Sequence, residues 1–249
     1  MNHLARFATA AAVLGAAALA TPALAQGDTR PTVAIMFFNN SVFTKDAREY
    51  EGLTKGIADF LTTEMAANPG IRVIERDQVQ RFFDLQKLAA GSQVDRETAV
   101  RIGKLLGAQH VVFGRFMADP RGNFRIDARV VGVENGAIEY SERVQDKSDN
   151  VMELVGALAA KLNAGMQLPP IAARAVNAGN TASATSLPAG APAAAPRLPM
   201  KYAIMYGTAL DLADRGDKAR ALELFSAVLK DYPDFEPAKK ARARLAPGG

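Results

Sequence analysis

The hydrophobic pattern of the first two thirds of the chain alternates between the spacing of strands and that of helices. Residues 33–38 form a continuous apolar run, which is typical of a strand covered on both faces. Over residues 51–66 apolar side chains recur every three or four positions, so we expect an amphipathic helix that ends before Pro69 and Gly70. The same reasoning predicts, in order, a strand at 71–74, a helix at 78–88, a helix between Asp95 and Gly107 and a strand at 111–116.

Residues 124–144 change to a period of two. Between 124 and 130 apolar and charged residues alternate, and an Asn-Gly pair at 135–136 predicts a hairpin before the alternation resumes at 138–144. A helical stripe then follows over 151–162. The predicted order is β-α-β-α-α-β-β-β-α, which gives an α+β domain with one mixed sheet whose later strands form an antiparallel meander open to water on one face.

The composition of the chain changes at Pro169. Residues 169–199 contain 6 Pro and 11 Ala in 31 positions and have no apolar period, so we predict an unstructured linker. This linker would separate a domain at residues 26–168 from a C-terminal piece at residues 200–249. The C-terminal piece is predicted to be a small all-α helical hairpin, with a further short helix near the end of the chain.

The N-terminus has the organisation of a cleavable secretory signal peptide over residues 1–25. A positive charge precedes an apolar run at residues 8–20, and Ala23 and Ala25 provide the small side chains that a signal peptidase reads, so cleavage is expected before Gln26. An uncleaved membrane anchor is the alternative, which the shortness of the run disfavours. No later segment is apolar over the length of a transmembrane helix, and the lack of Cys excludes disulfides and thiolate metal sites.

The charge of the chain is basic overall but not in the larger predicted domain. The sequence pI is about 9.4. Residues 26–168 carry 18 Lys and Arg against 19 Asp and Glu, whereas the residues from 200 onwards carry 9 against 7. Because the excess of positive charge lies in the linker and on a helix near the C-terminus, where cations are favoured, we expect no nucleic-acid partner.

The sequence lacks the motifs that support catalysis. His110 is the only histidine outside the predicted signal peptide, and its position at the start of an apolar strand indicates a structural role. The motifs of zinc proteases, serine hydrolases and phosphate-binding loops are absent, and no pair of carboxylates has a catalytic arrangement. We therefore expect a protein that is not an enzyme, with no catalytic residue, no cofactor and no metal.

Two polar clusters are candidate interaction sites. Glu75 and Arg76 stand at a strand-to-helix junction, where they could contribute to packing between subunits. The alternative is that Glu75 or Asp77 caps the helix while Arg76 lies over its neighbours. Arg125 and Arg129 share the polar side of a predicted strand, which could be an interface or simply a solvated sheet face.

Several stretches of the first domain resemble the curli production assembly/transport (CsgG) family. They are Pro31–Phe38, Val73–Arg76, Glu97–Ala108 with Val111–Gly114, and Asp127–Val131 with Asn135 and Gly136. The resemblance extends over Thr32–Asn163 and implies an envelope protein, since the best-known member is an outer-membrane lipoprotein that assembles into a ring and exports curli subunits. This chain lacks the lipid-anchor cysteine and the long inserted hairpins with which that member forms its pore.

The C-terminal piece resembles a single tetratricopeptide repeat, a helix-turn-helix of 34 residues. The positions that carry the resemblance are Ala209, Leu212, Gly216, Ala221, Phe225, Val228 and Pro233. The resemblance implies protein–protein interaction, and a plain helical hairpin without a partner is the alternative. A single repeat is too small to stack as repeat arrays do, so it could dock on the first domain, self-associate or stay marginal in stability.

Together these features predict a non-enzymatic component of cell-envelope assembly or secretion: a CsgG-like periplasmic module with a C-terminal interaction repeat. The expected partners are envelope proteins or further copies of the chain, with no nucleic acid and no integral membrane span. The expected location is the periplasm, either free or in association with the outer membrane. A pore subunit of the outer membrane for curli-type protein export is the alternative function.

Overall fold

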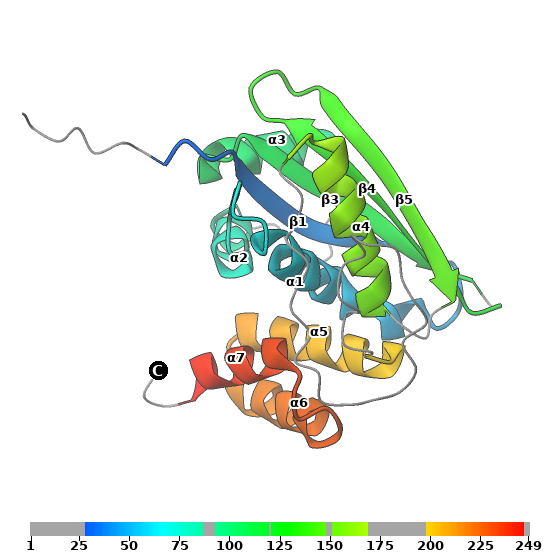
Figure 1. Cartoon of the computed structure of the whole chain (residues 1–249). Coiled ribbons are helices and arrows are strands. Elements are labelled where there is room, and N and C mark those ends of the chain that lie inside the picture. The colour runs from blue at the N-terminus through cyan, green and yellow to red at the C-terminus, as the bar shows by residue number, and fades with distance from the viewer. Residues whose placement is uncertain (1–27, 87–92, 120, 148–150, 169–197, 247–249) are drawn as a thin grey trace, which may run out of the picture.

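The computed structural model describes residues 28–86, 93–119, 121–147, 151–168 and 198–246. The predicted signal peptide, with Ala23, Ala25 and Gln26, lies outside the described residues, as does nearly all of the predicted linker. The described residues form a five-stranded sheet flanked by helices, and three C-terminal helices pack below it (Figure 1). The predicted fold class, a mixed-sheet α+β domain followed by a small helical part, is confirmed.

The sheet is mixed, and its strand order is β2-β1-β3-β4-β5. The strands are β1 (Thr32–Asn40), β2 (Arg72–Val73), β3 (His110–Ala118), β4 (Asn123–Gly132) and β5 (Ile138–Lys147). β1 pairs in parallel with β2 and β3, while β3, β4 and β5 form the predicted antiparallel meander. β1 is buried along most of its length, as its continuous apolar sequence predicts.

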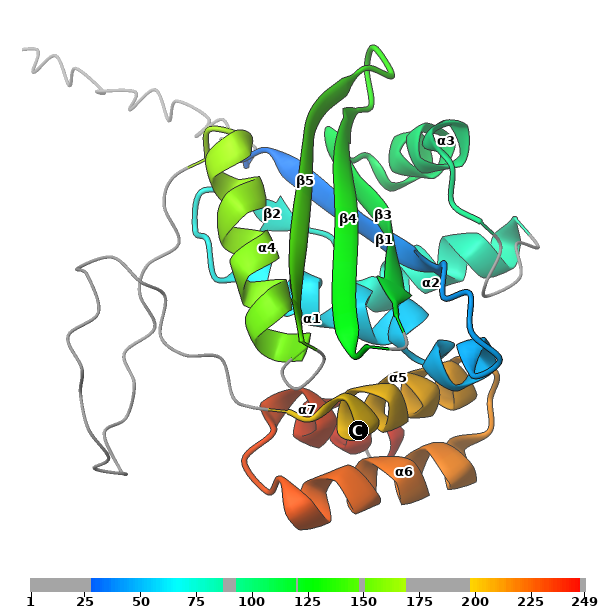
Figure 2. The same cartoon turned by 90° about the vertical axis from the view of Figure 1, so that its right-hand side faces the viewer.

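Helices cover both faces of the sheet. They are the short 3-10 helix η1 (Ala47–Tyr50), α1 (Leu53–Ala66), α2 (Arg76–Leu85), α3 (Arg96–Leu106), α4 (Val151–Gly165), α5 (Met200–Asp214), α6 (Lys218–Asp231) and α7 (Glu236–Leu245). Figure 2 shows α4 and α3 on opposite faces of the sheet. α1 packs beside α4, α2 packs beside α3, and α5 lies against α1. The C-terminal helices therefore dock on the first domain. Docking was one of the three possibilities that the sequence analysis left open.

Local signals explain where several helices begin and end. The Asp95 carboxylate caps α3 by accepting a hydrogen bond of 2.8 Å from the backbone N–H of Thr98. Gly107 ends the same helix with a φ of 66°, a left-handed conformation that glycine adopts without steric cost. α2 begins two residues earlier than predicted, at Arg76. Glu75 occupies its N-cap position, but its side chain accepts no capping hydrogen bond, so the capping role considered for Glu75 is not fulfilled.

The alternation in β4 is confirmed, and that in β5 is interrupted. Apolar side chains of β4 are buried on one face, and its charged side chains lie on the other. In β5, Tyr140 pairs with Val130 and Ile138 pairs with Val131, so Glu139 is an extra residue that forms a β-bulge. Because Val130 and Val131 face opposite sides, Ile138 does not share the face of Tyr140, and the strict period of two predicted for β5 is wrong at this point.

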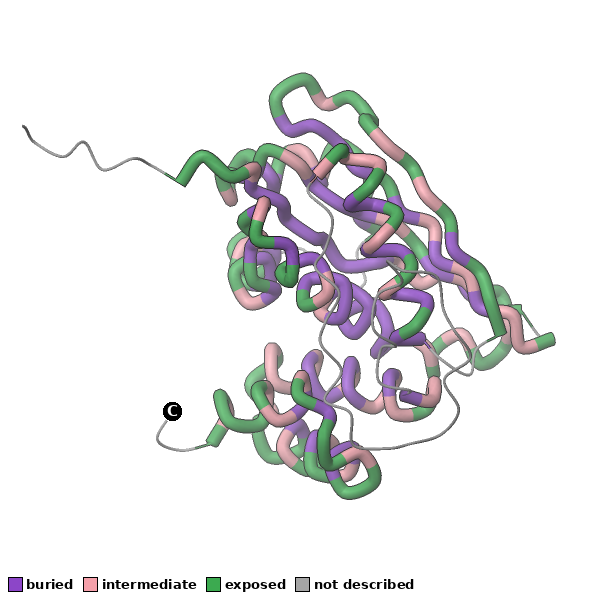
Figure 3. The backbone as a smooth tube through the Cα atoms, in the orientation of Figure 1, coloured by how far each residue is buried: buried purple, intermediate pink, exposed green. Residues whose placement is uncertain are grey.

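The hydrophobic core is continuous between the sheet domain and the C-terminal helices. Its buried members include Phe38 of β1, Phe60 of α1, Tyr206 of α5 and Phe225 of α6, and they belong to one cluster. Figure 3 shows buried residues in β1, in α1 and in the part of α5 that faces α1, whereas most residues of β5 and of the outer side of α6 are exposed. The C-terminal helices thus contribute to the same core as the sheet.

Candidate interaction sites

The contact between α1 and α5 depends on glycine. Gly56 of α1 and Gly207 of α5 are so close that a Cβ built on Gly56 would lie 3.5 Å from the Cα of Gly207. A Cβ built on Gly207 would overlap the carbonyl oxygen of Gly52. The absence of side chains at these positions lets the two helix backbones approach each other, which brings the polar residues beside the crossing into contact.

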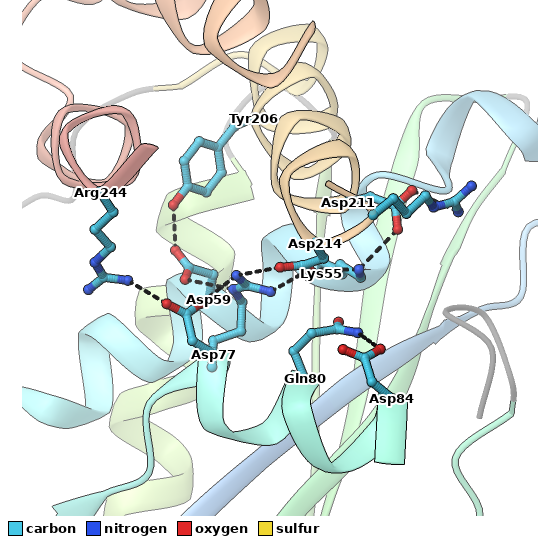
Figure 4. Close-up of polar contacts among 11 residues, drawn as sticks. Lys55, Asp59, Asp77, Gln80, Asp84, Tyr206, Asp211, Asp214 and Arg244 are labelled. Atoms are coloured by element: carbon cyan, nitrogen blue, oxygen red, sulfur yellow. Dashed lines mark hydrogen bonds and ion pairs between the residues drawn. The ribbon is translucent and has the colours of Figure 1, made fainter. Parts of the chain in front are cut away.

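A buried lysine marks this interface. The Nζ atom of Lys55, in α1, lies 2.7 Å from a carboxylate oxygen of Asp214 and 3.0 Å from one of Asp211, both in α5 (Figure 4). The Lys55 side chain is only 3% exposed. It also lies 5.6 Å from the centroid of the Phe37 ring, within the range of a cation–π interaction. The lysine is thus held between the sheet and the C-terminal helices.

Arg76 forms the second centre of the network. Its guanidinium lies 2.8 Å from Asp214 and 2.5 Å from Asp77, and its Nε lies 3.6 Å from Asp59. Burial alone would lower the pKa of Arg76, but the carboxylates, Asp214 foremost, outweigh burial and raise it. Asp77 in turn accepts a hydrogen bond of 3.1 Å from Arg244 of α7. The network therefore links α1, α2, α5 and α7 (Figure 4).

Asp59 and Tyr206 extend the network into the apolar core. The Tyr206 hydroxyl donates a hydrogen bond of 2.6 Å to Asp59. Burial raises the pKa of Asp59, against the opposing effects of this hydrogen bond and of Arg76. Burial likewise raises the pKa of Tyr206, and the neighbouring Asp59 adds to the effect. The Tyr206 ring stacks on Phe60 at a centroid distance of 5.2 Å and meets Phe225 and Phe235 at 5.7 and 5.3 Å.

The consequence of this network is specificity of docking more than net stability. A buried ion pair gains little over a well-packed apolar pair, but removal of one partner leaves a buried charge that costs about 3–5 kcal/mol. Lys55 and Arg76 belong to the sheet domain, and Asp214, which both contact, belongs to α5. The charges therefore fix the position of α5 on α1 and α2.

The structure places the two predicted members of the first candidate site differently. Glu75 is exposed, whereas the Arg76 side chain is only 6% exposed and points into the interface with α5. Arg76 therefore serves contacts within the chain. Glu75 remains available at the surface, and a role for it in packing between subunits stays a prediction.

The second candidate site is an arginine cluster on the sheet. Asp127 lies at its centre and receives a hydrogen bond of 2.6 Å from Arg125 and one of 2.9 Å from Arg143. Arg115 lies 3.7 Å from the same carboxylate. Arg129, two positions further along β4, is exposed. Partial burial would raise the pKa of Asp127, but the hydrogen bonds from Arg125 and Arg143 outweigh it and hold the pKa below its ordinary value.

The residues of the repeat signature lie in α5, in α6 and in the turn between them, except Pro233, which follows α6. Ala209, Ala221 and Phe225 are buried, Leu212 is partly buried, and Gly216 and Pro233 are exposed. Gly216 adopts a φ of 84° in the connection between the helices, which explains the glycine. Assignment of these helices to the tetratricopeptide repeats stays a prediction.

Other chemistry is sparse in the part of the chain that the structure describes. His110 lies 2.8 Å from Glu139 across the sheet, and both side chains are partly exposed. Across residues 28–246, apart from the gaps in the description, no three His, Asp or Glu side chains gather as metal ligands would. None of the described helices combines the length and the apolar character that a membrane crossing requires.

Reasoning from the sequence missed most of the interface network. Its missed members are Lys55, Asp59, Tyr206, Asp211, Asp214 and Arg244. One signal was present in the sequence: Gly52 and Gly56 stand one turn apart in the predicted first helix, and Gly207 lies in the first predicted C-terminal helix. Glycines inside helices cost stability, so they indicate a close contact with another backbone.

Comparison of the chain with solved structures finds several domains of similar fold. The C-terminal domain of LpoB from Salmonella enterica aligns with a TM-score of 0.38 at 17% identity, covering 49% of this chain and 87% of that domain. Lipoprotein GNA1162 from Neisseria meningitidis aligns with a TM-score of 0.40 at 15% identity, covering 55% and 96%. A PelC dodecamer from Paraburkholderia phytofirmans gives 0.34 at 13% identity, covering 56% and 88%. No curated protein sequence matches the chain.

A family model matches the first part of the chain. The match covers residues 15–119, beginning within the predicted signal peptide and ending one residue after β3. The matched family is described as the curli production assembly/transport component CsgG. Residues 15–119 thus match the model of the CsgG family domain, in agreement with the resemblance carried by residues 31–38, 73–76, 97–108 and 111–114.

Proposed function

We propose that this protein is a non-enzymatic assembly module of the bacterial cell envelope, in which a CsgG-like domain and a C-terminal interaction unit act as one body. The observation that carries the proposal is the CsgG family match over residues 15–119. The buried network of Lys55, Arg76 and Asp214 supports the second part, since it fixes the C-terminal helices on that domain. The predicted signal peptide supports a periplasmic location, either free or in association with the outer membrane.

The outer side of α6 is the surface that the proposal offers to a protein partner. α5 is occupied by its contact with α1, so it is not free to bind another chain. Glu223, Ser226 and Lys230 are exposed and stand at intervals of three and four residues, which places them on one face of α6. A tetratricopeptide-like unit would then present α6 to its partner, and not the helix that contacts α1.

Fractionation of cells tests the location, and crosslinking tests the partner. We expect the protein in the soluble periplasmic fraction, or on membranes in a form that carbonate releases. A photocrosslinking amino acid in place of Glu223 or Ser226 should capture a partner inside the cell, while the same probe at the exposed Lys104 of α3 serves as the matched control. A protein that stays monomeric and captures no partner from Glu223 or Ser226 would contradict the proposal.

The matched family description also favours one alternative, a subunit of an outer-membrane pore for curli-type export. The same fractionation separates the two functions. A pore subunit would resist carbonate extraction and migrate as rings that survive detergent, whereas an assembly module would do neither.

A further inference from the structure

The arginine cluster around Asp127 has a cross-shaped geometry. Asp127 pairs directly with Arg115 on β3 and with Arg143 on β5, so the two arginines flank it across the strands. Arg125 and Arg129 flank it along β4, two positions away in each direction. Strands are about 4.8 Å apart and alternate residues about 6.8 Å apart, so the four guanidinium-bearing positions surround one carboxylate at close range.

This cross lies on a part of the sheet that no described helix covers. Side chains of Arg125, Asp127 and Arg129 face away from α4, which contacts Glu142 on the opposite face through Lys161. Gly103 of α3 packs on the same face as the arginines, against Val111 and Val133. Arg115 and Arg143 are 52% and 63% exposed. Figure 2 shows α3 on the side of the sheet opposite to α4. The cluster is therefore accessible from solvent.

The charges of the cross are unbalanced. Four arginines stand against one aspartate, a net charge of 4 − 1 = +3. Among the described residues, Asp127 is the one carboxylate within ion-pair distance of Arg115, Arg125 and Arg143. Arg129 forms no ion pair with a described residue. The Asp127 carboxylate holds its neighbours in place, so part of the side-chain entropy that binding would cost is already lost in the free protein.

We infer that this arginine cross is a binding site for an acidic segment of a partner protein, laid along β4 in extended conformation. A guanidinium binds a carboxylate through two parallel hydrogen bonds, and ionised Asp and Glu carboxylates are the anions that the side chains of an unmodified protein segment offer at neutral pH. Arg125 and Arg129 are separated by roughly 13 Å along the strand. Carboxylates at positions i and i+4 of an extended chain have the same spacing, and an uncharged residue at i+2 would face Asp127.

The proposal does not depend on the proposed function or on the CsgG family match. It requires only that the face of β4 with Arg125 and Arg129 be open to solvent, and that Asp127 position the neighbouring arginine side chains. A failure of the binding test below would leave the location and the α6 surface untouched, and a failure of the fractionation test would leave the arginine cross untouched.

The test is fluorescence anisotropy of the full chain with a labelled nine-residue peptide. The peptide carries Glu at its first, fifth and ninth positions with Ser and Thr between, and a second peptide carries Gln in place of Glu. Arg129→Glu is the main variant, because its exposed side chain has no ion-pair partner among the described residues, and the fold should therefore be unaffected. Lys240→Glu, which makes the same charge change at an exposed position on α7, is the matched control.

We expect the Glu peptide to bind, the Gln peptide to bind at least about tenfold more weakly, and binding to weaken as salt rises. Arg129→Glu should weaken binding by about tenfold or more, while Lys240→Glu should stay within about twofold of the wild type. Equal binding to the two peptides, or an unchanged affinity in Arg129→Glu, would overturn the site. Binding to anionic vesicles or to polyphosphate without binding to the Glu peptide would overturn the choice of an acidic protein segment as its occupant.

Discussion

Lys55 and Asp214 lie 159 positions apart in the sequence, yet the Nζ of the lysine is 2.7 Å from a carboxylate oxygen of the aspartate. Both side chains are nearly inaccessible to solvent, and Arg76 contacts the same carboxylate from the adjacent helix. One aspartate of α5 thus forms ion pairs with two cations of the sheet domain. A single substitution at this aspartate should therefore weaken the packing of the C-terminal helices on the sheet domain.

Substitution Asp214→Ala should lower the free energy of unfolding by about 3 kcal/mol. Lys55 and Arg76 would remain buried with fewer carboxylates around them. Loss of one partner of a buried ion pair costs about 3–5 kcal/mol, and the lower end applies here because Lys55 keeps Asp211 and Arg76 keeps Asp77. Urea denaturation at neutral pH measures the change.

The control for this substitution is Asp234→Ala. Asp234 also belongs to an ion pair, 3.8 Å from Lys239, but its side chain is fully exposed. Exposed ion pairs contribute little to stability, so the free energy of unfolding should change by no more than about 0.5 kcal/mol. Equal effects of the two substitutions would show that the network does not hold α5 in place.

Glycine at position 207 is required by the crossing of α1 and α5. We expect Gly207→Ala to destabilise the protein by about 1–3 kcal/mol, because the added methyl group would overlap the backbone of Gly52 and force the helices apart. Gly156→Ala in α4 is the matched control, since a Cβ there meets nothing within 4 Å. Alanine is the better helix former, so this control should raise stability by about 0.5–1 kcal/mol. The two variants should shift the melting temperature in opposite directions.

The parts of this fold that could be predicted from the sequence are those with a local cause. The caps of α3 at Asp95 and Gly107, the buried run of β1 and the alternation of β4 each depend on residues within a few positions of one another. Periodicity therefore located these elements correctly. The bulge at Glu139 was missed because an unpaired extra residue leaves no mark in a pattern of polar and apolar letters.

The interface network could not be predicted, because its causes are distant in the chain. The apolar stripe of α1 runs through Leu53, Ile57 and Phe60, and a lysine beside it is ordinarily assigned to the solvent side. Lys55 is buried because α5 covers that side of α1, and apart from the glycines at positions 52, 56 and 207 the sequence carries no local sign of that contact. The same holds for Arg76, whose position at the predicted strand-to-helix junction left open whether it faces another subunit or lies over its neighbours.

The acid sensitivity of the fold should depend in part on Glu142. The backbone N–H of Arg143, the hydroxyl of Tyr140 and the ammonium of Lys161 in α4 all hydrogen-bond its carboxylate, and they lower its pKa from 4.5 to about 2. A carboxyl group with a lowered pKa in the folded state stabilises it above the ordinary pKa. That contribution is lost as the pH falls from about 4.5 towards about 2.

Substitution Glu142→Gln tests this dependence. At pH 6 the variant should be less stable than the wild type, and the difference in unfolding free energy should shrink as the pH falls through 4 towards 2. Urea denaturation at several pH values measures it. A difference that stays constant over this range would show that the carboxylate does not couple β5 to α4 through its charge.

Cleavage of the chain between its two parts should leave them associated. A protease site inserted between residues 169 and 197 would cut the covalent connection without touching a described residue of the interface. The two fragments share the network of Lys55, Arg76 and Asp214 and the ring cluster of Phe60 and Tyr206, so we expect them to elute together in size-exclusion chromatography. The same cleavage in the Asp214→Ala variant should release the C-terminal fragment at micromolar concentration, because Lys55 and Arg76 of the N-terminal fragment then lose the carboxylate of α5 that both contact. Separation of the wild-type fragments would mean that the tether, and not the buried contact, keeps α5 on α1.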